Sequence, residues 1–469
     1  MYKLKKKAYV AIFIVIFAIS SVYPSAIIVS HNQAVQKSSE EIVSSAYQGF
    51  YDDIGTIYDA ETDDGITIKT FRYHPPGEDF NWGGKPILLF PGLSVNINQF
   101  LTRTTPELED QFGEISLPDT LAPWAQGDQN IQEDPMLYYS YAYYLWSQGY
   151  DPWFGNYRGI GYGPAKSENA GWRVSLDDFA LYDVKAAVQK VYYVTGKHPY
   201  IGGHSTGGLC PLMYLQGTYY KWTGHVRSNY DLIEERNSID DGSQTVEGFI
   251  GLDPAWIPGM TKALDNIFLW ILASSDLKID LRSLIEFLLE DIPATEDILI
   301  WLFDKITEEY GEEVKEVFKY ILNIDTTNMN AELMYFFIRY AVDGLYFRTL
   351  GQYLDFIAHD TVRECFKNGW FNEWLTEPPE PGGWFDYYYY YIENTYKMSI
   401  PALIFLAEEE NDFMDLVDGD TVVRDVYNGK TWNENDELYW LEGAHIDMPI
   451  GLRAPVELYP KLGSWLVKV

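Results

Sequence analysis

The sequence predicts an α/β fold in which helices cover both faces of a mainly parallel sheet and a helical segment is inserted late in the chain. Three observations favour this class: short apolar runs bounded by glycine or proline, helical patterns between these runs, and a stretch over residues 259–397 in which helical patterns follow one another without obvious strands. Buried strands that alternate with helices are typical of parallel sheets. The chain has 469 residues, of which 47% are hydrophobic, so it can bury a large core.

The first expected strands lie in the N-terminal third of the chain. From Gly65 to Phe71, Ile66 and Ile68 alternate with polar residues, which indicates a half-exposed strand. The apolar run 87–90 is closed by Pro-Gly and predicts a strand buried on both faces. A helix that ends at Gly149 then leads into a strand over 150–154.

A long helix is expected after Ser175. Ser175 and Asp178 have the spacing of a capping box, and apolar residues then recur at helical spacing until Gly196 ends the pattern. Further short apolar runs predict strands over residues 200–202, 246–252 and 402–407.

Four lysines among the first seven residues precede an apolar run over residues 8–29, which is typical of an export signal. The run is also nearly long enough to span a bilayer, so a cleaved signal peptide and a retained membrane anchor both remain open. We therefore expect an exported protein, either secreted or anchored to the outer face of the membrane. The expected organisation is a signal or anchor over 1–30, a linker over 31–52, a core over 53–258 and 398–469, and a helical cap over 259–397.

The charge and the cysteine content exclude several classes of protein. Acidic residues outnumber basic ones by 69 to 34, and the net charge of −35 repels nucleic acid, so no nucleic-acid partner is expected. The only two cysteines, Cys210 and Cys365, exclude a disulfide framework and a Cys-rich metal site. A single bridge between them remains open.

Residues 203–207, GHSTG, match the pattern G-x-S-x-G between an expected strand and an expected helix. This context is that of the nucleophile turn of α/β-hydrolases, with Ser205 as the nucleophile. Glycines leave room for the sharp bend, and the N-terminus of the following helix directs N–H groups toward a developing oxyanion. We expect the N–H of Thr206 and the N–H of Leu93, which follows the 87–90 strand, to form the oxyanion hole.

A serine nucleophile needs a histidine base and a carboxylate that orients it. His445 is the only histidine beyond the last expected strand, and its loop-like context suits the base. Two carboxylates follow strands at suitable places, Asp253 and Asp412, and the spacing alone does not separate them.

With these residues identified, the chain from about Tyr51 to Leu466 resembles the acid lipase family, which contains gastric and lysosomal lipases. Residues 149–159 (GYDPWFGNYRG) look like the family's GYDVWLGNSRG, and residues 445–448 (HIDM) look like its HLDF. Residues 454–459 (APVELY) are similar to its APQEVY.

The resemblance bears on the acid of the triad. Asn411-Asp412 looks like the start of the family's NDxLAD turn, which favours Asp412 over Asp253, although the residues after Phe413 diverge. Against this, residues 251–255 (GLDPA) are similar to the segment that carries the acid in pancreatic-type lipases, so Asp253 stays as the alternative. Pro91 stands where the family has a histidine, and the segment 98–136 is longer than expected.

These residues together predict a serine carboxylic-ester hydrolase, lipase-like, that acts on lipid or acyl esters through Ser205, His445 and Asp412. Neither a metal nor an organic cofactor is needed for this chemistry. Two alternatives remain: an esterase that acts on small soluble or polymeric esters, and a non-catalytic exported protein that binds lipid with the same fold.

Overall fold

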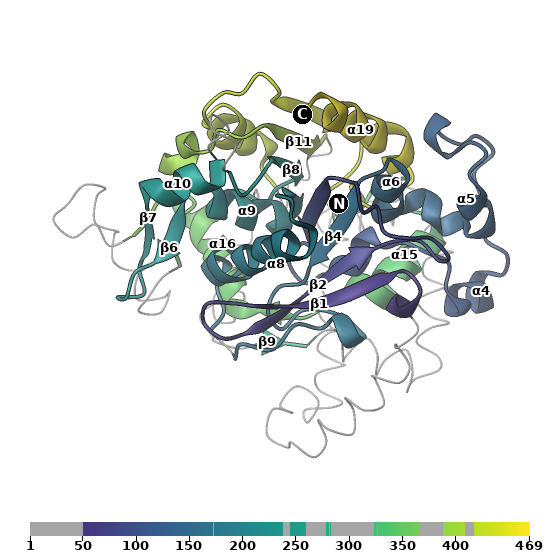
Figure 1. Cartoon of the computed structure of the whole chain (residues 1–469), viewed down its shortest axis with the longest axis horizontal. Helices are drawn as coiled ribbons and strands as arrows, with labels where there is room; N and C mark the ends of the chain where they lie inside the picture. The colour runs from purple at the N-terminus through teal and green to yellow at the C-terminus, as the bar shows by residue number, and fades with distance from the viewer. Residues whose placement is uncertain are drawn as a thin grey trace, which may run out of the picture.

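The computed structural model describes residues 50–171, 173–237, 244–258, 278–280, 282, 323–325, 327–365, 388–408 and 417–469. Its centre is an eight-stranded sheet with the order β1-β2-β4-β3-β5-β8-β11-β12 (Figure 1). β2 pairs antiparallel with β1 and β4, and every other pair is parallel, which confirms the predicted mainly parallel α/β sheet. The strands are β1 (Gly55–Glu61), β2 (Thr67–Tyr73), β3 (Pro86–Phe90), β4 (Asp151–Gly155), β5 (Tyr200–His204), β8 (Gly248–Leu252), β11 (Ala402–Ala407) and β12 (Glu437–Leu441).

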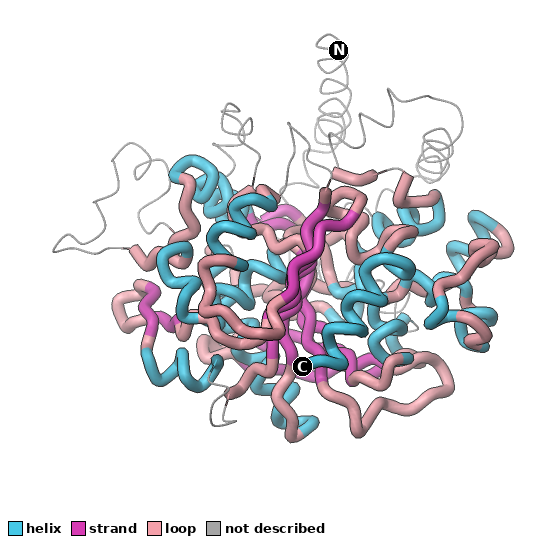
Figure 2. The backbone as a smooth tube through the Cα atoms, turned by 90° about the horizontal axis from the view of Figure 1, so that it is seen from above, coloured by secondary structure: helices cyan, strands magenta, loops and turns pink. Residues whose placement is uncertain are grey.

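Both faces of the sheet are covered, and the central strand β3 is accordingly apolar and buried at every position. In β3, Ile87 and Leu89 join the core on one face, whereas Leu88 and Phe90 join the core on the other. Side chains of a strand alternate between faces, so a continuous apolar run is what two cores require. Figure 2 shows the strands running between helices on two sides.

The helices fall into two groups that match the two cores. On one side, α6 (Tyr141–Ser147) contacts β2 and β4, and α19 (Tyr459–Lys468) packs on α6. On the other side, α8 (Lys185–Thr195) contacts β1, β2 and β3, while α9 (Thr206–Leu215) contacts β3, β5 and β8. The remaining α-helices of the core are α4 (Pro106–Phe112), α5 (Gln129–Glu133), α7 (Leu176–Asp178), α10 (Tyr230–Asn237) and α18 (Gly419–Thr421).

The helix expected after Ser175 is present. Ser175 and Asp178 form the predicted capping box, and Gly196 ends α8 in the left-handed conformation with φ of 69°. Between α7 and α8 the chain takes a π-helical turn, η5 (Phe179–Val184), which the periodicity did not predict.

The inserted segment is described only in part. It contains α15 (Ala331–Phe336), the π-helical turn η7 (Phe337–Ala341) and α16 (Phe347–His359). It also contains a short antiparallel pair of β9 (Lys278–Ile279) with β10 (Leu345–Tyr346), so the expectation of helices without strands differs from the structure there.

Residues 1–49, where the signal or anchor and most of the linker are expected, lie outside the described residues. The last residues of the expected linker pack on the core: Tyr51 is buried and its hydroxyl donates to Oδ1 of Asn98 at 2.6 Å. In the part of the chain that the structure describes, no helix is both long and apolar enough to cross a bilayer. Cys210 and Cys365 are both buried and neither is in a disulfide, so the open bridge between them is not formed.

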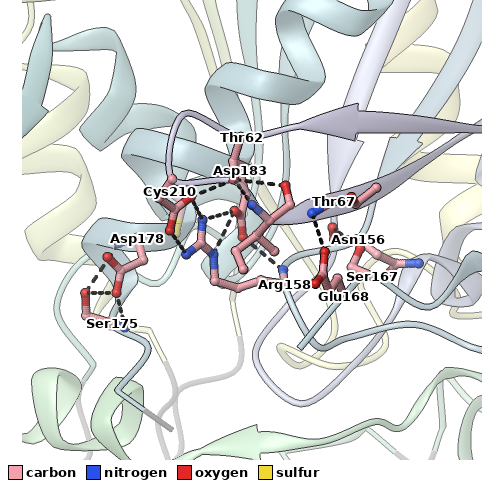
Figure 3. Close-up of polar contacts among 12 residues, drawn as sticks. Thr62, Thr67, Asn156, Arg158, Ser167, Glu168, Ser175, Asp178, Asp183 and Cys210 are labelled. Carbon is pink, nitrogen blue, oxygen red and sulfur yellow. Dashed lines mark hydrogen bonds and ion pairs between the residues drawn. The ribbon is translucent and has the colours of Figure 1, made fainter. Parts of the chain in front are cut away.

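A buried arginine ties the loop after β4 to the helix layer (Figure 3). Nε of Arg158 donates to Asp183 at 2.9 Å, and the backbone N–H of Arg158 donates to the second oxygen of the same carboxylate at 2.9 Å. The guanidinium also reaches Asp64 at 2.7 Å. Burial raises the pKa of Asp183 to about 6, against the opposing effect of Arg158. The loop after β4 is therefore fixed at both its backbone and its side chain.

Candidate active site

Ser205 stands at the tip of a tight turn between β5 and α9. Its backbone has φ of 57° and ψ of −120°, a conformation that L residues rarely adopt. Strain of this kind persists only where surrounding packing imposes it, and it is the geometry of a nucleophile turn. Ser205 is 7% exposed, which leaves a small part of the residue open at an otherwise buried place.

Two glycines flanking Ser205 explain why the bend is achievable. A Cβ on Gly203 would lie 2.0 Å from the carbonyl oxygen of Phe90, and a Cβ on Gly207 would lie 1.9 Å from the same oxygen. Both approaches are far closer than any side chain tolerates. The turn can therefore pack against the end of β3 only with glycine at these positions. Sheet order and turn together are those of the α/β-hydrolase fold.

Opposite this turn, His445 and Asp253 form a buried pair. Nδ1 of His445 lies 2.6 Å from Oδ2 of Asp253. Asp253 follows β8 directly, with φ of 47°, and its N–H donates to the carbonyl of Phe405 at 2.8 Å. Its other carboxylate oxygen accepts from the N–H of Ala407 at 3.2 Å. Asp253 is thus fixed by backbone hydrogen bonds between the ends of β8 and β11. Its carboxylate in turn contacts Nδ1 of the imidazole.

His204, the residue before the serine, contacts the backbone of the loop that carries His445. Nε2 of His204 lies 2.8 Å from the backbone oxygen of His445, and the two ring centroids are 4.6 Å apart. Burial, with a smaller effect of His445, holds the pKa of His204 well below its usual value. The ring is therefore neutral, and Nε2 is the protonated nitrogen because a carbonyl only accepts.

A neutral His204 with a proton on Nε2 offers Nδ1 as an acceptor. The side-chain oxygen of Gln99 lies 3.3 Å from this nitrogen, although an amide oxygen donates nothing. Among the described residues, Nε2 of Gln99 has no partner. Rotating this amide by half a turn lets its NH₂ donate to Nδ1 of His204 and removes both conflicts.

The loop after β3 passes directly over the nucleophile. A Cβ on Gly92 would lie 3.2 Å from Cβ of Ser205 and 3.3 Å from Nδ1 of His204. Within the described ranges, neither the N–H of Leu93 nor the N–H of Thr206 donates a hydrogen bond. Thr206 is the first residue of α9, where backbone N–H groups lack intrahelical acceptors and favour negative charge. Both N–H groups are therefore available to a bound oxyanion.

Of the site residues expected from the sequence, the described part of the chain contains Ser205, His445, Leu93 and Thr206. Asp412 lies outside the described residues, whereas the alternative acid, Asp253, contacts His445. The roles of His204 and Gln99 were missed. The motif places His204 beside the serine, but nothing in the sequence says which groups its ring contacts. Over the described residues, no group of three or more His, Cys, Asp or Glu side chains could hold a metal ion.

Comparison with known proteins finds a lipase among the relatives. The chain is 25% identical over 185 residues to Lipase lipl-1 of Caenorhabditis elegans, a match that spans 38% of this chain and 38% of that protein. No family model matches the chain.

Solved structures with a similar fold include two lipases. A Paleococcus ferrophilus monoacylglycerol lipase is 11% identical with a TM-score of 0.39, and covers 82% of this chain and 96% of its own. A soluble variant of monoglyceride lipase from Saccharomyces cerevisiae is 12% identical with a TM-score of 0.41, and covers 88% of this chain and 95% of its own.

Proposed function

We propose that this protein is a serine hydrolase of carboxylic esters. The observation that carries the proposal is the buried contact of 2.6 Å between His445 Nδ1 and Asp253, formed beside a strained serine turn. A carboxylate on Nδ1 fixes the imidazole tautomer and leaves Nε2 as the base. A scaffold without a catalytic role has no physical need for a serine in this backbone conformation next to such a pair.

In the proposed reaction, His445 Nε2 takes the hydroxyl proton of Ser205 as its Oγ attacks the ester carbonyl. The N–H groups of Leu93 and Thr206 stabilise the tetrahedral oxyanion. His445 then returns the proton to the leaving alcohol, and water releases the acid from the acyl-enzyme by the same steps. Asp253 stabilises the imidazolium throughout.

Asp253 takes the place of Asp412 in this proposal. The resemblance to acid lipases favours Asp412, but the contact between His445 and Asp253 occupies Nδ1, the nitrogen that an orienting carboxylate needs. The anchoring of Asp253 by the N–H of Ala407 and its own N–H bond to Phe405 further supports this choice. Both carboxylates are tested below.

We further propose that the substrate is a lipid or acyl ester, in keeping with the acid lipase resemblance and the partial similarity to a nematode lipase. The apolar run over residues 8–29 supports export, with the protein either secreted or held at the outer face of the membrane. The alternative substrates are small soluble or polymeric esters. A chain-length series of nitrophenyl esters separates them, since maximal kcat/KM at acetate removes the lipase proposal and leaves the esterase.

Covalent labelling with a phosphonate ester tests the hydrolase proposal itself. The parent protein should be labelled at Ser205, and Ser205→Ala should not. Ser147→Ala is the matched control, because Ser147 lies outside the site, where its hydroxyl donates to the carbonyl of Tyr144 and accepts from Nε2 of Gln148. A parent that is never labelled refutes the proposal and favours the non-catalytic lipid-binding alternative. Labelling that persists in Ser205→Ala refutes Ser205 as the nucleophile.

A further inference from the structure

The loop that carries Leu93 is braced by a segment of the cap. We call residues 340–344 the strap; they run from the last two residues of η7 to the start of β10. Val95 and Val342 form an isolated antiparallel bridge. On either side of it, the N–H of Asp343 donates to the carbonyl of Ser94 at 2.7 Å, and the N–H of Asn96 donates to the carbonyl of Ala341 at 2.8 Å. The strap thus provides the loop after β3 with a strand-like partner from the cap.

Asp343 is the side chain at the centre of this brace. Its carboxylate accepts from Nδ2 of Asn96 at 3.0 Å, from the N–H of Gly161 at 2.9 Å and from the N–H of Gly344 at 2.7 Å. Nδ2 of Asn96 also donates to the carbonyl of Tyr340 at 3.0 Å. One carboxylate therefore joins the loop after β3, the loop after β4 and the cap.

Asp343 is buried among the donors that it accepts from. It is 2% exposed, and burial raises the pKa of its carboxyl above the usual value, against the hydrogen bond from Asn96. Burying a carboxyl costs free energy unless hydrogen bonds replace its hydration, and here three donors do so. An apolar side chain in this place would leave these three buried donors without an acceptor, so the carboxyl fixes the positions of its donors relative to one another.

The position that the brace defines lies next to the nucleophile. Ser94, whose carbonyl accepts from Asp343, has φ of 59° and directly follows Leu93. Gly92, on the other side of Leu93, approaches Ser205 closely. The Leu93 N–H is therefore held between a contact with the serine turn and a hydrogen bond from the strap.

We propose that Asp343 is a positioning residue for the oxyanion hole, which holds the loop after β3 so that the N–H of Leu93 faces the reacting carbonyl. The inference rests on the proposed ester hydrolysis and deepens it. It means that a residue of the cap helps to position a group that stabilises the transition state. Asp343 does not touch the substrate; it acts through Ser94 and Asn96.

The test compares an ester with its thionoester in Asp343→Ala and Asp343→Asn. Sulfur accepts hydrogen bonds weakly, so a well-aligned oxyanion hole favours the ester, and the ratio of the two kcat values reports on donor alignment. In Asp343→Ala we expect kcat for the ester to fall about 100-fold, as when one oxyanion donor is lost, with KM little changed and the ester preference reduced. Asp343→Asn keeps one carbonyl acceptor and should lie between the alanine variant and the parent.

Asp355→Asn is the matched control. Asp355 is a buried carboxylate of the same cap, on α16, where it pairs with Arg363 at 2.8 Å and has no hydrogen bond to the loop after β3. This variant should lose stability while the ester preference stays at the parental value. Asn96→Ser provides a second route if Asp343→Ala fails to fold, because serine still caps η1 (Ile97–Phe100) but cannot make the two Nδ2 bonds.

An unchanged ester preference in the Asp343 and Asn96 variants overturns the inference, whatever happens to kcat, and assigns the strap a structural role only. This failure is distinct from failure of the proposed function. The latter appears as a parent protein that is not labelled at Ser205, whereas here the parent and the Asp343 variants are all labelled.

Discussion

Asp253 holds His445 at Nδ1 with a contact of 2.6 Å, although 192 residues separate the two in the chain. Both side chains are at most 4% exposed, so water does not compete for this contact. The contact identifies Asp253 as the carboxylate whose loss should disturb the proposed base, His445.

Asp253→Asn should lower kcat about 10⁴-fold, since an amide fixes the wrong imidazole tautomer, while KM changes little. Steady-state hydrolysis of a nitrophenyl ester measures both constants. Asp412→Asn is the comparison and should keep parental kcat. The reverse pattern, activity retained in Asp253→Asn and lost in Asp412→Asn, would return the acid to the residue that the family resemblance favours.

His204→Gln should change how stability depends on pH. Burial lowers the pKa of His204, so below the usual value of 6.5 the unfolded chain binds a proton that the folded protein does not. The parent therefore loses stability relative to the variant as pH falls below 6.5, by about 1.4 kcal/mol per pH unit until the folded pKa is reached. Above pH 6.5 the difference should be constant. Urea unfolding of both proteins between pH 5 and 8 measures this, and a difference independent of pH contradicts a buried neutral ring.

Gly207→Ala should destabilise the serine turn, because the new Cβ would lie 1.9 Å from the carbonyl oxygen of Phe90. The expected cost in the free energy of unfolding is about 1–3 kcal/mol, and ester hydrolysis should fall with it as the turn moves. Gly83→Ala is the control, since a Cβ there meets nothing within 4 Å. Equal stability of the two variants would show that the turn packs less closely against β3 than described.

Arg158→Met should be more destabilising than the loss of an exposed ion pair. It leaves Asp183 buried without its cation, a change that typically costs about 3–5 kcal/mol. Arg424→Met removes a pair with Asp425 in which the arginine side chain is 56% exposed, and should cost at most about 1 kcal/mol. Urea denaturation measures the loss in the free energy of unfolding for both variants. Similar losses would show that Arg158 does not have the structural role described here.

The centre of the fold could be predicted from the sequence because its signals are local. β3, β5 and β8 are short apolar runs, and the serine turn is marked by glycines that its close packing requires. β1 and β12 were not predicted. They are the edge strands of the sheet, are mostly half-exposed, and carry charged residues such as Asp59 and Glu437, so their apolar pattern is weak.

The candidate site could be predicted only as far as single motifs allow. Ser205 and His445 stand in recognisable local contexts, but Asp253 and Asp412 both follow strands, and only the three-dimensional structure brings one of them to the imidazole. The contact between Asn96 and Asp343 spans 247 residues and involves no motif. Contacts of this kind depend on how the cap segment packs against the core, and no local sequence pattern predicts that packing.

The pairing of β8 with β11 has a consequence for the order of events during synthesis. These neighbouring strands are joined through the whole inserted segment, so bringing them together closes a very long loop, and non-local parallel pairing of this sort is slow. The N–H of Asp253 bonds to Phe405 on the later strand. A nascent chain that has emerged only as far as α16 therefore already contains the serine turn but lacks the partner that seats its acid. Under the proposed mechanism, such a chain lacks its base and is inactive until the final strands and the loop with His445 leave the ribosome.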